Sequence, residues 1–176
     1  SISFVGDTAR SANVRVWDWI LKNWRIATVG KSPFPQSGTS STSASVAFYL
    51  GRKINELTGK QVKYVTHFKP STAISGWFNG ATRGTQMDSV LIKATESGVP
   101  RIDLFVWIQG EQDNASSYIT YNTSWDSIKA TLRRQAYFKL TTPIVAVGMP
   151  QVSQGAKNTW QGADKLLRAY DTNTGP

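Results

Sequence analysis

Four runs of mostly apolar residues along the chain have the pattern of β-strands. They cover residues 2–5, 62–68, 102–108 and 144–149. The run at 102–108 is nearly continuous in apolar character, which is typical of a strand that is buried on both faces. Pro143 and Pro150 bound the last run, and proline is common where a strand begins or stops.

Four further stretches have the spacing of amphipathic helices. Their apolar residues recur every three or four positions and so share one helix face. The four stripes are Val46, Leu50, Ile54 and Leu57; Met87, Val90, Leu91 and Ala94; Trp125, Ile128, Leu132 and Ala136; and Trp160, Ala163, Leu167 and Tyr170. Gly59 and Gly98 follow the first two stripes as helix stops. Strands that alternate with helices predict an α/β fold with a parallel sheet covered on both faces.

Residues 14–29 fit this alternation less well. Residues 14–19 alternate between apolar and polar positions as a strand does, and Trp24 follows a turn-like pair, Lys22-Asn23. A small β-hairpin is the best interpretation of this segment. Residues 37–45 are almost all Ser, Thr and Gly, and we expect them to be a loop that leads into the next helix.

Length and composition narrow the class of protein. The chain of 176 residues fits one domain with a sizeable core, so we expect residues 1–176 to form a single domain. It has no cysteine, which excludes disulfides and thiolate metal sites, and we expect no metal or cofactor. No apolar run approaches the roughly 20 residues of a membrane span, and the first residues lack a signal-peptide pattern. A soluble protein without membrane contact is therefore expected.

Charge and aromatic content suggest kinds of partner. The net charge of +9 would speed encounters with nucleic acids, acidic glycans or anionic cell surfaces. The adjacent basic pairs, at residues 52–53 and 133–134, fall in predicted helices, where a solvated helix face explains them better than a nucleic-acid groove. Seven Trp, seven Phe and six Tyr exceed the needs of a core of this size. We expect some of these aromatic side chains at a surface that binds sugar rings.

Polar residues cluster where the predicted strands end, which is where open parallel sheets bind ligands. The third strand runs directly into Gln109-Gly110-Glu111-Gln112-Asp113. Gly110 lets the backbone turn sharply and approach a ligand. The amide of Gln109 can donate to a developing oxyanion, and the carboxylates of Glu111 and Asp113 can orient a base or bind hydroxyls. A polar loop that caps the next element is an equally simple interpretation.

Residues 107–113, Trp-Ile-Gln-Gly-Glu-Gln-Asp, resemble the Trp-x-Gln-Gly-Glu-x-Asp/Asn block of sialate O-acetylesterase-like carbohydrate esterases in the SGNH/GDSL hydrolase superfamily. Three other segments are similar to family segments in order and spacing: 14–19 with Trp24, 45–50 and 72–77. Residues 118–150 resemble versions found in phage tail fibres and tailspikes, which remove acyl groups from bacterial surface polysaccharide. The resemblance covers most of the chain.

The resemblance implies a three-layer α/β/α sandwich with a mostly parallel central sheet, of flavodoxin-like type. It also implies a serine nucleophile that is activated by a histidine. Gln109 would help to form the oxyanion hole, and Glu111 would be a carboxylate that supports the site. Asp113 stands where the family block carries Asp or Asn.

The substrate side of the implied site comes from two loops. Gly110 would lie against the substrate, and Ser71 and Thr72 belong to a loop that resembles the family's second conserved block. Pro70 and Ser71 stand where that block has two glycines, which weakens one expected oxyanion donor. Trp77 would line the substrate rim, with packing under the loop as the alternative interpretation.

The reacting groups depart from the family pattern. Gly6-Asp7-Thr8 is the segment comparable to the nucleophile block, and Thr8 takes the serine position, where its extra methyl crowds the approach to a carbonyl. Either Thr8 is the nucleophile of a degenerate block, or the true block preceded residue 1 in a longer chain. No histidine follows Asp171, where the family carries one, and the sole histidine, His67, is interpreted as a structural strand residue. We therefore expect a domain that is incomplete at one or both ends.

Taken with the resemblance, these features predict a carbohydrate O-acyl (acetyl) esterase-like domain that acts on or recognises bacterial surface polysaccharide. If the site is completed, the activity would be that of a carboxylic ester hydrolase. The alternative is a catalytically inactive glycan-binding or structural module of a phage virion. The expected location is the virion or the extracellular space. Expected partners are an acylated polysaccharide or glycan, other virion proteins, or a second copy of the chain; nucleic acid is the least favoured.

Overall fold

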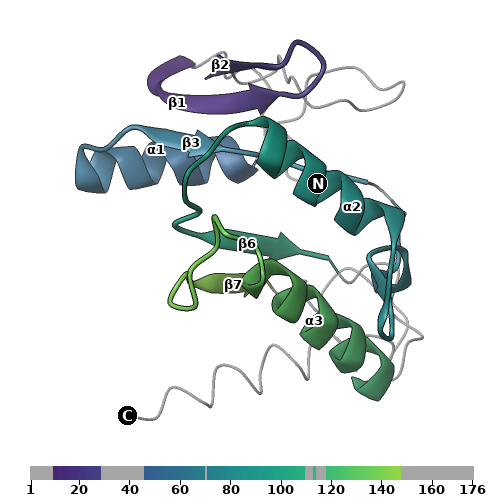
Figure 1. Ribbon diagram of the computed structural model, residues 1–176. Coiled ribbons are helices and arrows are strands. Elements are labelled where there is room, and N and C mark those ends of the chain that lie inside the picture. Colours follow the sequence, from purple (N-terminus) through teal and green to yellow (C-terminus); the bar gives the residue numbers. More distant parts are fainter. Residues whose placement is uncertain (1–9, 29–45, 70, 110–112, 114–117, 148–176) are drawn as a thin grey trace. The chain divides into compact units, whose positions relative to one another are not determined.

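The computed structural model of the chain describes residues 10–28, 46–69, 71–109, 113 and 118–147 (Figure 1). Its residues divide into two compact units. Unit 1 comprises Ser1–Lys69 and Ser89–Gly98, and unit 2 comprises Pro70–Asp88 and Val99–Pro176. Helix α2 (Thr85–Glu96) begins in unit 2 and ends in unit 1.

Unit 1 contains a three-stranded mixed sheet in the order β2-β1-β3. Strands β1 (Arg10–Asp18) and β2 (Asn23–Thr28) pair antiparallel, which confirms the hairpin predicted within residues 14–29. Strand β3 (Val62–Tyr64) pairs parallel with β1, and helix α1 (Val46–Thr58) connects the hairpin to it along the chain (Figure 1).

The turn of the hairpin is organised by the carboxylate of Asp18, which is 4% exposed. Its Oδ1 accepts the backbone N–H of Ile20 at 3.1 Å and that of Leu21 at 3.0 Å, and its Oδ2 accepts Nη1 of Arg25 at 3.0 Å. Burial alone would raise the pKa of Asp18, but these bonds and the charge of Arg25 outweigh burial and lower it. Lys22 completes the turn with φ +51°.

The core of unit 1 is formed by Val14, Val16, Ala27 and Phe48. Helix α1 packs closely against this core at Gly51. A Cβ at that position would lie only 3.0 Å from Cγ1 of Val14, so a glycine there allows the close approach. The helix was predicted correctly, whereas its predicted apolar stripe was not the buried face. Leu57 of that stripe is 73% exposed. Close contact between backbone and sheet at the glycine decides which face is buried.

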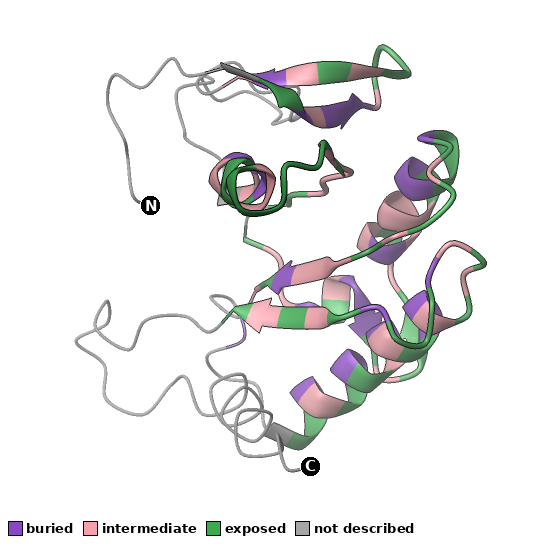
Figure 2. Ribbon diagram, turned by 90° about the vertical axis from the view of Figure 1, so that its left-hand side faces the viewer, coloured by how far each residue is buried: buried purple, intermediate pink, exposed green. Residues whose placement is uncertain are grey.

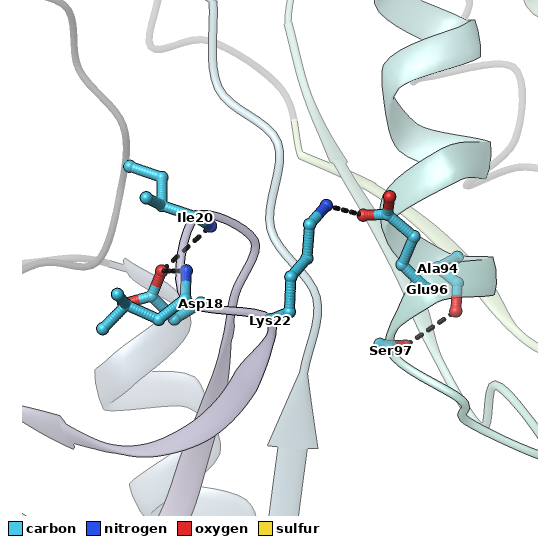
Figure 3. Close-up of polar contacts among 7 residues, drawn as sticks. Asp18, Ile20, Lys22, Ala94, Glu96 and Ser97 are labelled. Carbon is cyan, nitrogen blue, oxygen red and sulfur yellow. Dashed lines mark hydrogen bonds and ion pairs between the residues drawn. The ribbon is translucent and has the colours of Figure 1, made fainter.

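The end of α2 is held to the hairpin within unit 1. Trp24 donates its indole N–H to the carbonyl of Ser97 at 3.2 Å. The ammonium of Lys22 reaches the carboxylate of Glu96 across the space between the turn and the helix (Figure 3). Gly98 then terminates the helix with φ +65°, as its position after the second stripe predicted.

Unit 2 is built on a pair of parallel strands, β6 (Phe105–Ile108) and β7 (Ile144–Val147). Helix α3 (Tyr118–Arg133) lies between them in sequence, which forms a β-α-β arrangement. The remaining elements of this unit are a short 3₁₀ helix, η1 (Ile74–Gly76), and a small antiparallel pair, β4 (Phe78–Asn79) and β5 (Thr82–Arg83).

Helix α3 contributes the largest group of buried side chains in unit 2, and the segment of η1 and β4 adds Ile74, Trp77 and Phe78. Trp125, Ile128 and Leu132 of the third predicted stripe are all buried, which confirms that stripe as a core face. Figure 2 shows buried and exposed positions alternating along α3 as its surface turns from core to solvent. Ala136 of the same stripe lies beyond Arg133, where the helix ends, and is exposed.

The expected three-layer sandwich with a mostly parallel central sheet is wrong. The described strands form three small sheets: one mixed with three strands, one antiparallel pair and one parallel pair. Two causes are visible. First, three of the predicted runs contain only three or four paired residues, and exposed Asp103 interrupts the third of these runs. Second, β1 has an antiparallel partner in the hairpin. The predicted strand 2–5 and the fourth stripe lie outside the described residues.

Among the described residues, none of the helices is long and apolar enough to cross a membrane.

Candidate functional site

Gln109 directly follows β6, and hydrogen bonds hold its side-chain amide from three directions. Nε2 donates to the backbone carbonyl of Thr72 at 3.1 Å and also to Oδ2 of Asp113. Oε1 accepts the hydroxyl of Tyr121 at 2.9 Å. Because a primary amide has two protons, both donors of Gln109 are used within the protein.

Asp113 is buried, with 2% exposure, and its carboxylate connects two loops of unit 2. Besides the amide of Gln109, its Oδ2 accepts the backbone N–H of Ile74 at 2.8 Å. Ile74 is the first residue of η1, and Ala73 before it supplies no side-chain cap. Asp113 therefore accepts the first backbone N–H of this short helix, as an N-cap residue would, although it is distant from the helix in sequence.

Tyr121, on the first turns of α3, completes the network. Its hydroxyl donates to Oε1 of Gln109 and accepts the indole N–H of Trp107 at 3.2 Å. Burial is the main cause that raises the pKa of Tyr121 to about 12; the charge of Asp113 raises it further, and the bond from Trp107 opposes both. The phenol is thus neutral at physiological pH and orients the amide of Gln109.

Trp77 lies in a buried aromatic cluster and not at an open rim. It is 8% exposed and packs edge-on against Trp107, with ring centroids 4.8 Å apart. Trp107 in turn contacts Trp125 of α3 at 5.3 Å between centroids. Of the two interpretations of Trp77, the geometry favours packing beneath the loop.

The structure brings three of the sequence-predicted site residues together: Gln109, Asp113 and Thr72, the last through its backbone carbonyl. Ser71 is exposed and takes a left-handed backbone conformation, with φ +53°. The remaining predicted residues lie outside the described residues: Thr8, Gly110 and Glu111.

Sequence reasoning missed Tyr121, although a signal for it was present. Tyr121 precedes Trp125 by four residues, so it extends the third apolar stripe by one turn. A tyrosine on a buried face needs a partner for its hydroxyl, and the polar residue directly after the predicted strand can supply one.

The chemistry open to this arrangement follows from its hydrogen bonds. Gln109 can stabilise an oxyanion through its side chain only if it gives up Thr72 or Asp113. As arranged, the network fixes the loop after β6 against the loop before η1. His67 belongs to unit 1, where its Nδ1 lies 3.0 Å from Nζ of Lys93. Among the described residues, no group of three or more His, Asp or Glu side chains could hold a metal ion.

Comparison with known proteins gives a likeness of fold. No protein-family model and no curated protein matches the chain. Among solved structures, it is similar to a protein of Arabidopsis thaliana whose X-ray structure was determined at 1.6 Å resolution. The TM-score is 0.58 and the identity 18%, over 96% of this chain and 84% of the other. At that identity the likeness concerns the fold alone, and the resemblance to carbohydrate esterases stays a prediction.

Proposed function

We propose that the chain is a carbohydrate O-acyl esterase-like domain that acts on or recognises acylated polysaccharide. The observation that supports the proposal is a hydrogen bond within the Trp-x-Gln-Gly-Glu-x-Asp segment. Its first and last polar residues, Gln109 and Asp113, bond to each other at the carboxyl end of a parallel strand. That end of a parallel strand is where α/β proteins bind ligands.

In this proposal Gln109, Asp113 and Tyr121 are positioning residues. Together they hold the loop before η1 and the loop after β6 in fixed geometry. Rigid loops are what an ester-binding site needs, because a small displacement of oxyanion donors or of the substrate carbonyl lowers the rate strongly. The oxyanion role first expected for the Gln109 side chain is replaced by this structural one.

For hydrolysis, the hydroxyl of Thr8 is the candidate nucleophile in the sequence, and a base must take its proton as it attacks the ester carbonyl. The net charge of +9 supports an acidic polysaccharide as substrate, since opposite charge speeds encounter. We place such a domain in a phage virion or outside the cell, with other virion proteins or a second copy of the chain as further partners.

A second candidate function is favoured by one observation. Both protons of the Gln109 amide are engaged by protein oxygens, which suits a site that binds an acylated glycan without turning it over. In that case the chain is a catalytically inactive glycan-binding or structural module of a virion.

The experiment that separates these functions measures binding and turnover on the same polysaccharide. Acetate release from an O-acetylated bacterial polysaccharide and hydrolysis of p-nitrophenyl acetate are followed with the chain and with Thr8→Ala. Calorimetry compares binding of the acetylated and the chemically de-acetylated polysaccharide. Turnover that is lost in Thr8→Ala supports the esterase, and acetyl-dependent binding without turnover supports the binding module. Neither turnover nor acetyl-dependent binding would reject both.

A matched pair of variants tests the network in that assay. Gln109→Ala should lower turnover or acetyl-dependent affinity by about tenfold or more, since the two loops lose their common anchor. Gln135→Ala is the control, because its Nε2 also donates to a backbone carbonyl in the same unit, that of Thr131 at 3.0 Å, at the other end of α3. Equal effects of the two variants would contradict the assignment. Trp77→Ala does not serve here, because it would open a cavity in the core.

A further inference from the structure

The positive charge of the chain is concentrated in unit 1. This unit has eleven Lys and Arg residues against four Asp and Glu, whereas unit 2 has nine against seven. The three acids of unit 1 that the structure describes each pair with a base: Asp18 with Arg25, Glu56 with Arg52, and Glu96 with Lys22 (Figure 3). An excess of positive charge therefore remains in this unit after its described acids are paired.

Two of the bases in excess lie side by side on the sheet of unit 1. Val14 and Val16 of β1 and Tyr64 of β3 pack in the core on the side of α1. Side chains alternate along a strand, so Arg15 and Lys63, which stand next to these residues in sequence, point to the opposite face. Arg15 and Lys63 are also register partners in the parallel pair of β1 and β3. Two positive charges are thus direct neighbours on the face that α1 does not cover.

This pair of bases has no anion to compensate it in the part of the chain that the structure describes. Like charges directly opposite each other on adjacent strands are destabilising. Among the described residues, no carboxylate forms an ion pair with Arg15 or Lys63. Within the same residues, Nε of half-buried Arg15 has no hydrogen-bond acceptor, and neither has Nε1 of Trp17, two places further along β1. Guanidinium and indole nitrogens only donate, so this face lacks a negatively charged acceptor.

An aromatic ring lies beside these charges. Nζ of Lys63 is 5.5 Å from the ring centroid of Trp24 on β2. Because β1 lies between β3 and β2, the side chain of Lys63 crosses β1 to reach that ring. Trp24 is partly exposed and packs edge-on against its register partner Trp17, with ring centroids 5.5 Å apart. Cations next to a partly exposed indole suit a ligand that combines an anionic group with an apolar ring surface, as an acidic sugar does.

We propose that Arg15 and Lys63 form an anion-binding site that takes the carboxylate of an acidic sugar in a polysaccharide. The guanidinium of Arg15 donates two parallel hydrogen bonds to the carboxylate, and the ammonium of Lys63 donates from the neighbouring strand. The sugar ring packs beside Trp24. The choice of a polysaccharide rests on the function proposed above, whereas the need for an anion rests on the site itself. Binding here requires no ester on the sugar.

Calorimetry with a polymer that carries no acyl group tests this site independently of esterase activity. Polygalacturonate has a carboxylate on each sugar, and its methyl ester is the same polymer without the charge. The unmodified chain should bind polygalacturonate and show no measurable binding of the methyl ester. Arg15→Gln and Lys63→Gln should each lower the affinity by about tenfold, because each removes a charge-assisted hydrogen bond.

A double variant on α1 is the matched control. Arg52 and Lys53 are exposed bases of this helix, which packs on the other face of the sheet. Arg52→Gln with Lys53→Gln removes the same two charges from unit 1 as Arg15→Gln with Lys63→Gln. The control should lower the affinity for polygalacturonate by less than about twofold, since the α1 bases act on the ligand only through screened, long-range attraction.

Stability separates a binding role of these residues from a structural one. Arg15→Gln relieves the repulsion between the two bases, so the urea unfolding midpoint should not fall. Lys63→Glu places a carboxylate next to Arg15 and thereby supplies the missing negative charge within the chain. Its midpoint should be at least that of the unmodified chain, while binding of polygalacturonate should be lost. Loss of binding that comes with a lowered midpoint in both variants would mean that the bases stabilise the sheet and form no site.

The remaining outcomes distinguish the ligand and the proposed function. Equal affinity for polygalacturonate and its methyl ester, or equal losses in the two double variants, would overturn the site. Tighter binding of polyphosphate or of a DNA duplex at the same ionic strength, lost in Arg15→Gln, would overturn the assignment to a carboxylate. Binding of polygalacturonate at this site, without turnover or acetyl-dependent binding of the acetylated polysaccharide, would support the anion site and reject the esterase-like function.

Discussion

The side-chain amide of Gln109 donates a hydrogen bond to the carboxylate of Asp113, and this bond closes the loop after β6 on itself. The same carboxylate oxygen accepts the N–H of Ile74, so two separate loops depend on one buried acid. Gln109 and Asp113 of the Trp-x-Gln-Gly-Glu-x-Asp segment therefore stabilise the two loops, whether or not the segment takes part in a reaction. A sequence pattern that indicates an active site can therefore also arise because its residues stabilise loops.

Replacing Asp113 with Asn tests how much this acid stabilises the fold. Both donors reach Oδ2, so the one carbonyl oxygen of Asn can still accept them, but it carries no negative charge and both hydrogen bonds become weaker. We expect a loss of about 2 kcal/mol in the free energy of unfolding, measured by urea denaturation at pH 7.

Asp126→Asn is the control for that measurement. Its carboxylate is 55% exposed and pairs with Lys129 at 2.7 Å on the surface of α3. Surface pairs of this kind contribute little, so the loss should stay below about 1 kcal/mol. Similar losses in the two variants would mean that the Asp113 network does not stabilise unit 2.

Tyr121→Phe removes the hydroxyl that joins Trp107 to Gln109. A buried indole N–H and a carbonyl oxygen then lose their partner, which should reduce the free energy of unfolding by about 1–3 kcal/mol at neutral pH. The pKa of Tyr121 is raised to about 12, so the folded chain holds this proton more firmly than the unfolded chain does. Stability should therefore decline between pH 10 and 12.

That alkaline decline offers an internal check. It should be weaker in Tyr121→Phe, although it should not vanish, because burial also raises the pKa of Tyr64. Unfolding midpoints in urea at pH 9, 10 and 11 would measure the difference. An identical pH dependence in both proteins would contradict the role given to the Tyr121 hydroxyl.

The elements that could be predicted from sequence were those with local causes. Helices α1, α2 and α3 follow from apolar spacing, and Gly59 ends α1 with φ +68° as a helix stop should. The hairpin followed from alternation around Lys22-Asn23. Gln109 was correctly expected directly after a parallel strand, because a continuous apolar run passes there into polar residues. The expectation that this strand is buried on both faces is wrong, since Ile108 at its end is 45% exposed.

What could not be predicted depends on contacts between distant residues. Alternation does not say which strands will pair when they are distant in sequence: β3 pairs with β1 and β6 with β7, in separate sheets, so the described strands do not form the expected single, mostly parallel sheet. Periodicity also gave the wrong face of α1, because the close approach of Gly51 to Val14 is a tertiary contact. His67 was interpreted as a strand residue for the same reason: its partner Lys93 is 26 residues away.

Asp18 offers a test of the hairpin turn. Asp18→Ala removes the acceptor of two backbone N–H groups and the partner of Arg25, and we expect a loss of about 1–2 kcal/mol in the free energy of unfolding. Asp18→Asn keeps the turn acceptor and loses only the charge, so its cost should be smaller. The pKa of Asp18 is lowered in the folded chain, so its stabilisation should disappear as the pH falls from about 4 through that lowered value.

Urea unfolding of the three proteins at pH 7 and pH 3 checks this prediction. The difference between the unmodified chain and Asp18→Asn should shrink at pH 3, because the carboxyl is then largely neutral in the unfolded chain. A difference that stays constant with pH would assign the effect to side-chain shape and not to charge.

Gly84 is the position where we expect a single methyl group to cost most. A Cβ there would lie 2.2 Å from the backbone oxygen of Gly76 and 2.7 Å from its backbone carbon. Neither atom belongs to a flexible side chain, so the backbone itself must move, and the bond from the Gly84 N–H to the carbonyl of Trp77 at 2.8 Å would be disturbed. We expect Gly84→Ala to lower the free energy of unfolding by at least about 2–3 kcal/mol.

Gly59→Ala separates this steric cost from the cost of backbone conformation. Gly59 has φ +68°, and a Cβ at this position would meet nothing within 4 Å, so the substitution adds left-handed strain without overlap, about 1 kcal/mol. The urea unfolding midpoints should therefore rank the unmodified chain first, Gly59→Ala second and Gly84→Ala last. If Gly84→Ala were as mild as Gly59→Ala, the turn between η1 and α2 would have room to open. The loop that Asp113 holds in place would then be less rigid than the proposed site requires.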